Sequence, residues 1–239
     1  MSLIFKTRIL TPERMDLEPL NAQSAAEILK TLETINAWLG GVRATLWHLK
    51  RFSRRWSPGQ SIRIVDWGTG GADVPRAIVR WARREGYHAE IVGVDSNRVV
   101  ADYAREACRE YPEIKIVDGD VSFRRNDGAG EPFDYAISSL CLHHLSDQEI
   151  VELLRKSDRC ARRGMIMNDL KRSARAWAWI WALSRLGRVH SIVQADGPLS
   201  VKRAFTPQEL GNLADRANVA YAGVYAHFGY RLTLAGEKL

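Results

Sequence analysis

The first 60 residues carry apolar side chains with the spacing of amphipathic helices. Between residues 22 and 39 they recur every three or four positions, which predicts a helix with one buried face. Asn21 is a suitable N-cap for this helix, and Gly40-Gly41 is a suitable end. A second helix is predicted over about 42–55. We therefore expect residues 1–60 to form an N-terminal helical segment.

From residue 61 onwards short apolar segments alternate with amphipathic helices. The segments predicted as strands are 61–68, 88–95, 113–120, 132–140 and 164–170, and the helices between them are predicted over about 73–86, 97–110 and 147–158. Strands that alternate with helices of this length favour right-handed βαβ units and a parallel sheet that is covered on both faces. The expected fold class is therefore α/β, with a doubly wound sheet.

The last third of the chain is predicted to complete this sheet. One helix is predicted over 171–186, and another begins at Thr206-Pro207. Two apolar segments in residues 219–238 are joined by a turn too short for a crossover, so the last strand must run antiparallel to its neighbour. We expect residues 61–239 to form one domain with a seven-stranded, mostly parallel sheet and a lid insertion at about 171–205.

The composition is that of a soluble globular protein. Of the 239 residues 46% are hydrophobic and 26% charged. The three cysteines form no C-x-x-C pair, which argues against a disulfide framework and against a thiolate zinc site. The N-terminus shows no signal-peptide pattern, and the longest apolar run, residues 176–183, is far shorter than the ~20 residues that span a bilayer. We expect a soluble, cytoplasmic protein.

The formal net charge of +7 is compatible with nucleic acid or an anionic membrane as a partner. The excess consists mainly of arginine doublets scattered along the chain, and no run reaches five like charges. This distribution favours a solvated basic surface and makes a nucleic-acid partner the weaker interpretation.

A glycine-rich loop follows the first predicted strand, in the segment IRIVDWGTGGAD of residues 62–73. In open α/β sheets this loop commonly holds a ligand at the carboxyl ends of the strands. Asp73 occupies the position of the third glycine of the dinucleotide fingerprint, where its carboxylate would repel a pyrophosphate. The Lys-Ser/Thr pair of a P-loop is also absent. Because Asp66 and Asp73 flank Gly68 and Gly70, the loop suits a cationic, nucleoside-like ligand without phosphates.

Two further acids end the next predicted strands. Asp95 ends the second strand, where a carboxylate can accept hydrogen bonds from both hydroxyls of a ribose. Asp120 ends the third strand, where it either accepts from the exocyclic amine of an adenine or belongs to a turn with Gly119.

The motifs DWGTGGAD, VDSN, DGDV and FDYAISSLCLHHLSD occur in an order that resembles the class I S-adenosylmethionine-dependent methyltransferases, over about residues 61–169. The segments SSLCLHHL and NAWLGGVR are similar to those of small-molecule methyltransferases of quinone and polyketide-phenol pathways. The resemblance implies a Rossmann-like fold and S-adenosylmethionine as cofactor. It also implies contacts from Asp66, Gly68 and Gly70 to the methionine part, from Asp95 with Ser96 to the ribose, from Asp120 with Val121 to the adenine, and from Ser138 and Ser139 near the methyl group. Ala72 and the bulky Trp67 depart from the family pattern.

Three side chains after the fourth and fifth predicted strands are the catalytic candidates. His143 and His144 are suited to act as a base toward a phenol, although one of them can equally pack beneath the loop. Asp169 either orients a hydroxyl group or caps the following helix. No metal is predicted, because adjacent histidines on an extended chain point to opposite sides and cannot easily share one ion.

The helix predicted over 171–186 is apolar on two faces. We expect Trp177 and Trp181 to roof the acceptor site and Trp38 to close its other wall. A dimer interface or a contact with the N-terminal helices would also explain the second apolar face. The arginines on both sides of this helix would suit an anionic membrane surface or a carboxylated acceptor.

The sequence therefore predicts a methyltransferase that acts on a small apolar or aromatic acceptor. Oxygen is the favoured methyl-accepting atom. One alternative is an RNA methyltransferase that uses the basic surface, although the Asn/Asp-Pro-Pro-Tyr/Phe motif of many amino-methyltransferases is absent. Another is a non-catalytic, cofactor-binding partner of a second subunit. A dehydrogenase is disfavoured by Asp73.

Overall fold

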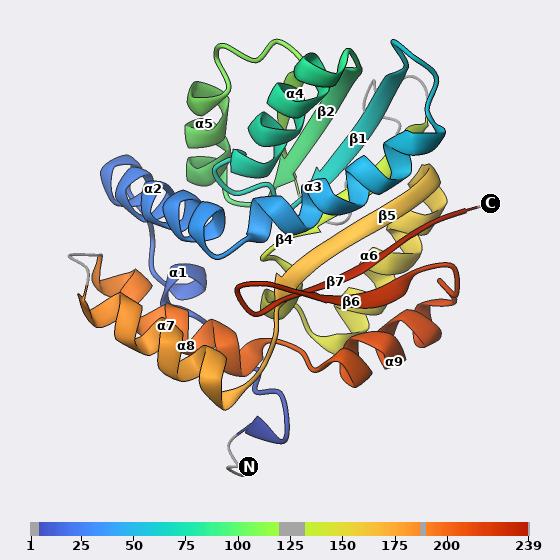
Figure 1. Ribbon diagram of the computed structural model, residues 1–239. Coiled ribbons are helices and arrows are strands. Elements are labelled where there is room, and N and C mark those ends of the chain that lie inside the picture. The colour runs from blue at the N-terminus through green and yellow to red at the C-terminus, as the bar shows by residue number, and fades with distance from the viewer. Residues whose placement is uncertain (1–4, 120–131, 187–189, 239) are drawn as a thin grey trace.

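The computed structural model describes residues 5–119, 132–186 and 190–238, and its centre is a seven-stranded sheet (Figure 1). The strands are β1 (Ser61–Trp67), β2 (His88–Asp95), β3 (Ile114–Asp118), β4 (Phe133–Ser139), β5 (Ala161–Leu170), β6 (Gly223–His227) and β7 (Arg231–Glu237). Their order is β3-β2-β1-β4-β5-β7-β6. Strand β7 pairs antiparallel with both β5 and β6, and the other pairs of neighbours are parallel. The predicted fold class is confirmed.

Helices cover both faces of this sheet. On one side lie α3 (Gly41–Phe52), α4 (Asp73–Glu85) and α5 (Arg98–Ala107), and on the other lie α6 (Asp147–Cys160) and α9 (Pro207–Ala217). Because side chains alternate along a strand, Ile64 of β1 packs into the core beneath α3 and α4, whereas Val65 packs into the core beneath α6 and α9. Burial on both faces explains why the strands are apolar along their whole length.

The remaining helices gather beyond the carboxyl ends of the parallel strands. They are α1 (Arg14–Leu17), α2 (Ala22–Trp38), α7 (Ala174–Leu186) and α8 (Ser191–Arg203), and α8 packs against each of the other three. The Asn21 side chain caps α2 by accepting from the amide of Ser24, at 2.8 Å. Helix α8 was not predicted from the sequence, because Gly197 and Pro198 lie within it and both disfavour helix. No helix in the described part of the chain has both the length and the apolar content needed to cross a membrane.

Candidate active site

A cavity of about 540 Å³ opens at the carboxyl ends of β1 and β2, where the order of the strands changes direction. We call it the donor cavity. Five of the predicted cofactor contacts line it, namely Gly68, Gly70, Asp95, Ser96 and Ser139. Helix α2 and the segment around α1 close it from the other side. The structure thus brings the glycine-rich loop and the acid at the end of β2 to one site.

The glycine-rich loop is shaped for a ligand at Gly68 and Gly70. Both residues have a positive φ, +65° and +55°, a conformation that favours glycine. A Cβ atom at Gly68 would approach the thiol of Cys141, whereas no atom lies within 4 Å of the place where a Cβ of Gly70 would stand. The amide of Gly70 donates to Oδ2 of Asp95 at 2.9 Å, which ties the loop to β2. The backbone at Gly70 therefore faces open space in the cavity.

Two of the predicted contacts support this loop instead of lining the cavity. Asp66 is buried below it and accepts from the Thr69 hydroxyl at 2.8 Å, while its Oδ1 has no hydrogen-bond partner. Burial raises the pKa of Asp66 to about 8. The hydroxyl of Ser138 donates to the carbonyl oxygen of Trp67 at 2.8 Å. The predicted adenine contacts Asp120 and Val121 lie outside the described residues.

The donor cavity is acidic. Among the described residues that line it, five carry carboxylates and none is lysine or arginine; the carboxylates are Asp16, Glu33, Asp73, Asp95 and Glu149. Burial raises the pKa of Asp73 and of Asp95, although hydrogen bonds from the Asn36 side chain and from backbone amides oppose this. The Asn36 amide, on α2, donates to Asp73 at 2.7 Å. This surface suits a cationic ligand and would repel a pyrophosphate.

A second cavity, of about 310 Å³, adjoins the first, and we call it the acceptor cavity. Met15, Leu32, Leu140 and His144 line both cavities, so the two meet at these side chains. Most of its wall is aliphatic, built from Ile28, Ile35, Leu39, Leu170, Ile180, Leu183, Ile192 and Val193. Its main polar groups are Glu13, His143, His144, Asp196 and Arg231. A small apolar molecule with one polar end would fit this cavity.

His143 is held by Asp169 beside the junction of the two cavities. Nδ1 of His143 lies 2.7 Å from Oδ1 of Asp169, and its amide donates to Oδ2 of Asp169 at 3.1 Å. Burial opposes the charge on Asp169, but the attraction of His143 and these hydrogen bonds hold the pKa of Asp169 below its usual value. An ionised carboxylate only accepts, so Nδ1 of His143 carries a proton, and the opposite ring nitrogen, Nε2, faces Oε1 of Glu13 at 3.6 Å.

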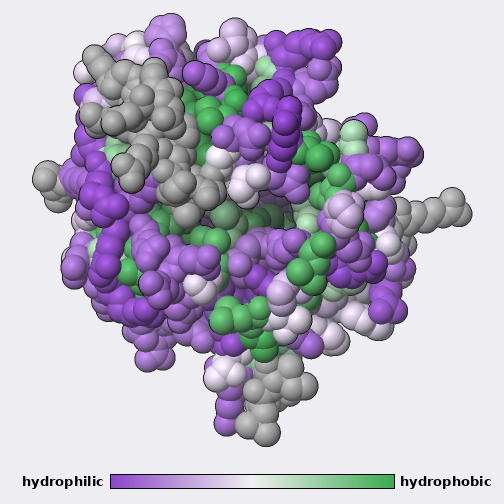
Figure 2. All heavy atoms as spheres, turned by 180° about the vertical axis from the view of Figure 1, so that it is seen from behind, coloured by the Kyte–Doolittle hydropathy of each residue, from purple (hydrophilic) through white to green (hydrophobic). Residues whose placement is uncertain are grey.

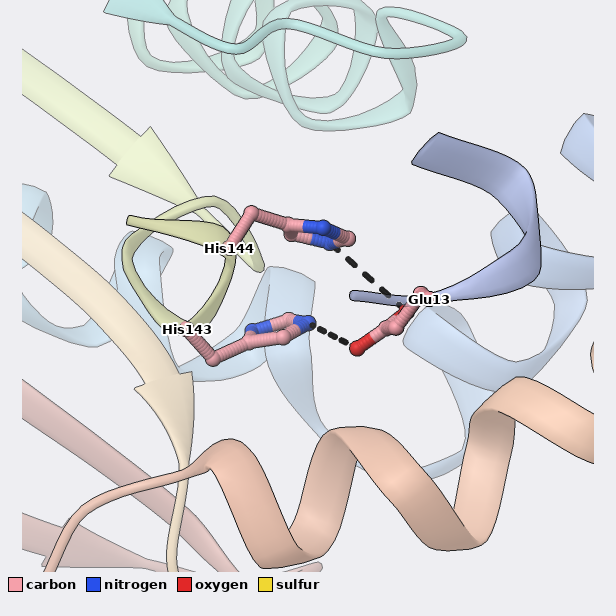
Figure 3. Close-up of side chains that lie close together, drawn as sticks. All are labelled: Glu13, His143 and His144. Carbon is pink, nitrogen blue, oxygen red and sulfur yellow. Dashed lines mark ion pairs between the residues drawn. The ribbon is translucent and has the colours of Figure 1, made fainter. Parts of the chain in front are cut away.

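His144 lies beside His143, and both rings face the carboxylate of Glu13 (Figure 3). His144 also pairs with a second carboxylate, that of Asp16. Its Nδ1 lies 3.0 Å from Oδ1 of Asp16. Burial opposes a charge on His144, but the hydrogen bond to Asp16 and the charge of Glu13 raise its pKa. Glu13 faces both rings, with Oε1 3.6 Å from Nε2 of His143 and Oε2 3.9 Å from Nε2 of His144. Oε1 of Glu13 is buried and has no hydrogen-bond partner.

One premise of the sequence analysis is wrong for the two histidines. They lie in a 3₁₀ turn, Leu142–His144, and not on an extended strand. Their ring centroids are therefore 4.3 Å apart, and both rings face Glu13. Ligand atoms of Glu13, His143 and His144 lie within 4.8 Å of one another, close enough for one ion to bridge. The argument from alternating side chains therefore does not exclude a metal here.

Of the three tryptophans predicted to surround an acceptor, one lines this cavity. Trp38 lines the acceptor cavity, but Trp177 and Trp181 do not. Helix α7 does form part of the wall, through Ile180 and Leu183. Trp177 instead packs against Phe5, at 6.4 Å between ring centroids, and stacks on Trp181. The helical phase places these two rings beside the cavity.

The sequence analysis missed the residues of α1. The side chain of Asp196, on α8, accepts from the amides of Arg14 and Met15 at 2.9 and 3.0 Å, which fixes α1 over the junction of the cavities. Glu13 and Asp16 exchange hydrogen bonds as a capping box. The spacing of this Glu-x-x-Asp pair is visible in the sequence, but nothing in the sequence places it next to the histidines.

Comparisons with known proteins agree with this geometry. The sequence model described as a methyltransferase domain matches residues 64–164. No curated protein matches the chain significantly in sequence.

Among solved structures, the pyocyanin biosynthetic protein PhzM is similar, with 16% identity and a TM-score of 0.54 over 78% of this chain and 53% of its own. Human N-acetylserotonin methyltransferase in complex with S-adenosylmethionine has 14% identity and a TM-score of 0.60, over 91% of this chain and 56% of its own. Magnesium protoporphyrin IX methyltransferase from Synechocystis, with bound S-adenosylhomocysteine, has 14% identity and a TM-score of 0.52, over 93% and 90%. The chain thus spans about half the length of the first two.

The order of the strands, the glycine-rich loop at the carboxyl end of β1 and the matched segment lead to one assignment. Residues 64–164 match a methyltransferase domain, and the sheet around them has the Rossmann-like fold found in methyltransferases.

Proposed function

We propose that this protein transfers the methyl group of S-adenosylmethionine to a hydroxyl group of a small apolar or aromatic acceptor. The observation that carries the proposal is the pair of adjoining cavities, one acidic and one apolar, that meet at His144 beside the His143–Asp169 pair. This arrangement provides separate places for a donor and an acceptor, with a histidine base between them.

The residues of the donor cavity fit this cofactor. S-adenosylmethionine supplies, when bound, a methyl group on a positively charged sulfur. The open backbone at Gly70 leaves room for the cofactor, and the surrounding carboxylates suit its charge. Gly68 and Gly70 would hold the methionine part, Asp95 and Ser96 the ribose, and Ser139 the region near the methyl group.

His143 acts as the base for the acceptor. Asp169 keeps the proton on Nδ1, so Nε2 is free to take the proton of a hydroxyl group at the polar end of the acceptor cavity. A positioned general base typically contributes 10²–10⁴-fold to a rate. The walls of the acceptor cavity supply a further effect, because methyl transfer needs the two reactants held in line.

The shape of the acceptor cavity favours a small molecule over a macromolecule. Its wall is mainly aliphatic, and Glu13, His143 and His144 are gathered at its polar end. Burial of apolar acceptor surface against this wall would supply most of the binding free energy. The similar structures named above include methyltransferases for N-acetylserotonin and magnesium protoporphyrin IX, which supports this substrate class.

Calorimetric titration with S-adenosylhomocysteine tests the cofactor part. The wild-type protein should bind it more tightly than NAD. Asp95→Ala should weaken binding roughly 10- to 150-fold, as expected for the loss of about 1.5–3 kcal/mol from hydrogen bonds to a charged group. Asp102→Asn, an exposed carboxylate on α5, is the control and should bind normally. Tighter binding of NAD, or an Asp95→Ala variant with wild-type affinity, would contradict the assignment.

Transfer of a radiolabelled methyl group to a panel of phenols, quinols and aliphatic alcohols tests the acceptor part. We expect product from hydroxylated apolar compounds and none from their methyl ethers. Methylation of bulk transfer RNA without methylation of any phenol would replace this proposal with the RNA alternative.

A further inference from the structure

Three segments of the chain carry basic residues without any acidic ones. Residues 34–65, 170–186 and 216–236 contain twelve of the 35 lysines and arginines and none of the 28 aspartates and glutamates. Eight of these twelve side chains are exposed. The rest of the chain has 23 basic and 28 acidic residues, so the positive net charge of the protein comes from these three segments.

Part of each segment lies at or near the mouth of the acceptor cavity, although most of their basic side chains lie elsewhere on the protein. Trp38 and Leu39, at the end of α2, line the cavity on one side, and Ile180 and Leu183 of α7 line it on the other. The turn between β6 and β7 packs against the end of α2 so closely that a Cβ atom at Gly229 would overlap the backbone of Leu39. Figure 1 shows this hairpin turn next to the junction of α2 and α3.

Large apolar side chains are exposed around this mouth. Trp38 is 78% exposed, Phe228 76%, Trp179 52% and Trp181 43%. Two of these rings make a cation–π contact with an arginine. The guanidinium of Arg43 lies 5.5 Å from the ring centroid of Phe228, and that of Arg185 lies 5.3 Å from the ring centroid of Trp181. We call Trp38, Arg43, Trp181, Leu183, Arg185 and Phe228 the mouth surface.

The combination of rings and cations on this surface has a specific chemical meaning. Monomeric soluble proteins rarely expose several large apolar side chains together without a partner. Tryptophan, phenylalanine and arginine are the side chains that settle at the level of lipid headgroups, because their rings are apolar and arginine binds phosphate. Seen from behind, the molecule is covered mainly by hydrophilic residues, with smaller hydrophobic patches around a central hollow (Figure 2).

We propose that the mouth surface docks on a membrane that contains anionic lipids and that the acceptor is a lipophilic molecule that enters the cavity from this membrane. The arginines contact lipid phosphates, and the exposed rings enter the headgroup layer. Thr34, Trp38 and Leu183 are the exposed residues of the cavity wall, so the cavity opens on the docked side. The route of the acceptor rests on the proposed function, whereas docking itself does not.

Nucleic acid is the competing partner for a basic surface, and the mouth surface fits it less well. Phosphate backbones are bound by arrays of lysine and arginine, and single-stranded bases stack on exposed rings in a charged groove. Here Trp38 lines a cavity whose wall is mainly aliphatic and which is not an open, charged groove.

Co-sedimentation of the full chain with lipid vesicles tests the proposal. One set of vesicles contains phosphatidylcholine alone, and the other a mixture of phosphatidylcholine and phosphatidylglycerol. We expect at least roughly tenfold tighter binding to the anionic vesicles, with binding that weakens as salt is added. Equal binding to both sets, or binding to neither, would overturn the proposal.

Two pairs of variants locate the contact. Arg43→Glu with Arg185→Glu should weaken binding to anionic vesicles roughly tenfold or more. Arg84→Glu with Arg109→Glu should have little effect, because these exposed residues precede β2 and β3 and lie toward the amino ends of those strands, away from the cavities. If both charge variants weaken vesicle binding equally, the anionic lipids are attracted to the positive charge of the whole protein, and the mouth surface is not the docking site.

A further double variant tests the exposed rings of the mouth surface. Trp181→Ser with Phe228→Ser should lower vesicle binding and reduce the blue shift of tryptophan fluorescence on docking, to which Trp38 still contributes. Leu17→Ser, an exposed leucine outside the mouth surface, should change neither. Neither ring lines a cavity, so the affinity for S-adenosylhomocysteine should stay at the wild-type value and report intact folding.

The outcomes separate docking from the proposed function. Wild-type protein that binds S-adenosylhomocysteine but no vesicle would refute docking and leave the methyltransferase proposal standing. Vesicle binding without any affinity for S-adenosylhomocysteine would refute the methyltransferase proposal and leave docking standing. A structured RNA that binds more tightly than anionic vesicles at equal salt, and loses affinity in the Arg43/Arg185 variant, would assign the surface to nucleic acid instead.

Discussion

Replacing Asp169 by asparagine should slow methyl transfer while the cofactor still binds. The carboxylate accepts from Nδ1 of His143 at 2.7 Å and from the amides of His143 and Leu170 at 3.1 and 2.6 Å. An asparagine has nearly the same shape, but its NH₂ group would donate to Nδ1. The proton of His143 would then move to Nε2, the atom that should take the proton of the acceptor.

The size of the effect follows from the role of a general base. We expect the rate of the chemical step to fall roughly 10²- to 10⁴-fold, which corresponds to about 2.7–5.5 kcal/mol in the activation barrier. The folded state should lose about 1.5–3 kcal/mol, the value of hydrogen bonds to a charged group. Because the folded-state pKa of Asp169 is lowered, its stabilising effect is present above the unfolded-state pKa and is lost as the pH falls through the folded-state value.

Single-turnover methyl transfer with saturating cofactor, measured from pH 5 to pH 10, provides the assay. The wild-type protein should transfer the methyl group at neutral pH, whereas the Asp169→Asn rate should recover only at high pH, where the acceptor ionises by itself. Asp134→Asn is the matched control, since Asp134 is also buried, accepts from the amide of Arg63 at 2.9 Å and lies away from both cavities. A variant Asp169→Asn with the wild-type rate and pH profile would refute the base mechanism.

Three further outcomes follow from the same contacts. Leu183→Trp should narrow the acceptor cavity and raise the acceptor KM without changing cofactor affinity. Trp177→Ala, beside the cavity, should leave KM unchanged and lower the melting temperature by an amount equivalent to about 3–5 kcal/mol. Equal effects of the two variants on KM would contradict the assignment of Leu183, and not Trp177, to the cavity wall. Burial lowers the pKa of His48 to about 3, so the unfolded chain takes up this proton first, and stability should decline as the pH falls from about 6.5 toward 3; melting curves of His48→Gln should depend less steeply on pH over this range. Micromolar Zn²⁺ should inhibit by binding Glu13 and His143, chelator should restore activity, and inhibition that is as strong in Glu13→Gln would exclude this site.

Most of the fold was predictable from the sequence because its signals are local. The alternation of short apolar strands with amphipathic helices predicts the parallel sheet, and the short turn before β7 requires its antiparallel direction. Asn21 and the Thr206 capping box mark where two helices begin, because a side chain within three residues satisfies the free backbone amides. Helix α8 was not predicted because its glycine and proline weaken the local helix signal in the sequence. Packing against α1, α2 and α7 stabilises it in the structure.

The sequence also predicted part of the lining of the donor cavity. The acids and glycines at the ends of successive strands must meet, because parallel strands present their carboxyl ends at one edge of the sheet. Gly68, Gly70, Asp95 and Ser139 accordingly line one cavity.

Only the tertiary structure decided the acceptor site. Glu13 lies 130 positions before His143 in the chain, and it reaches the histidines because Asp196 of α8 fixes α1 in place. The helical pattern of 171–186 shows which residues share a face, but it cannot show which face meets the cavity, and the packing of α7 on α8 turned Ile180 inward in place of Trp181. Such contacts between distant segments depend on how helices pack against one another, and no local pattern of residues encodes that arrangement.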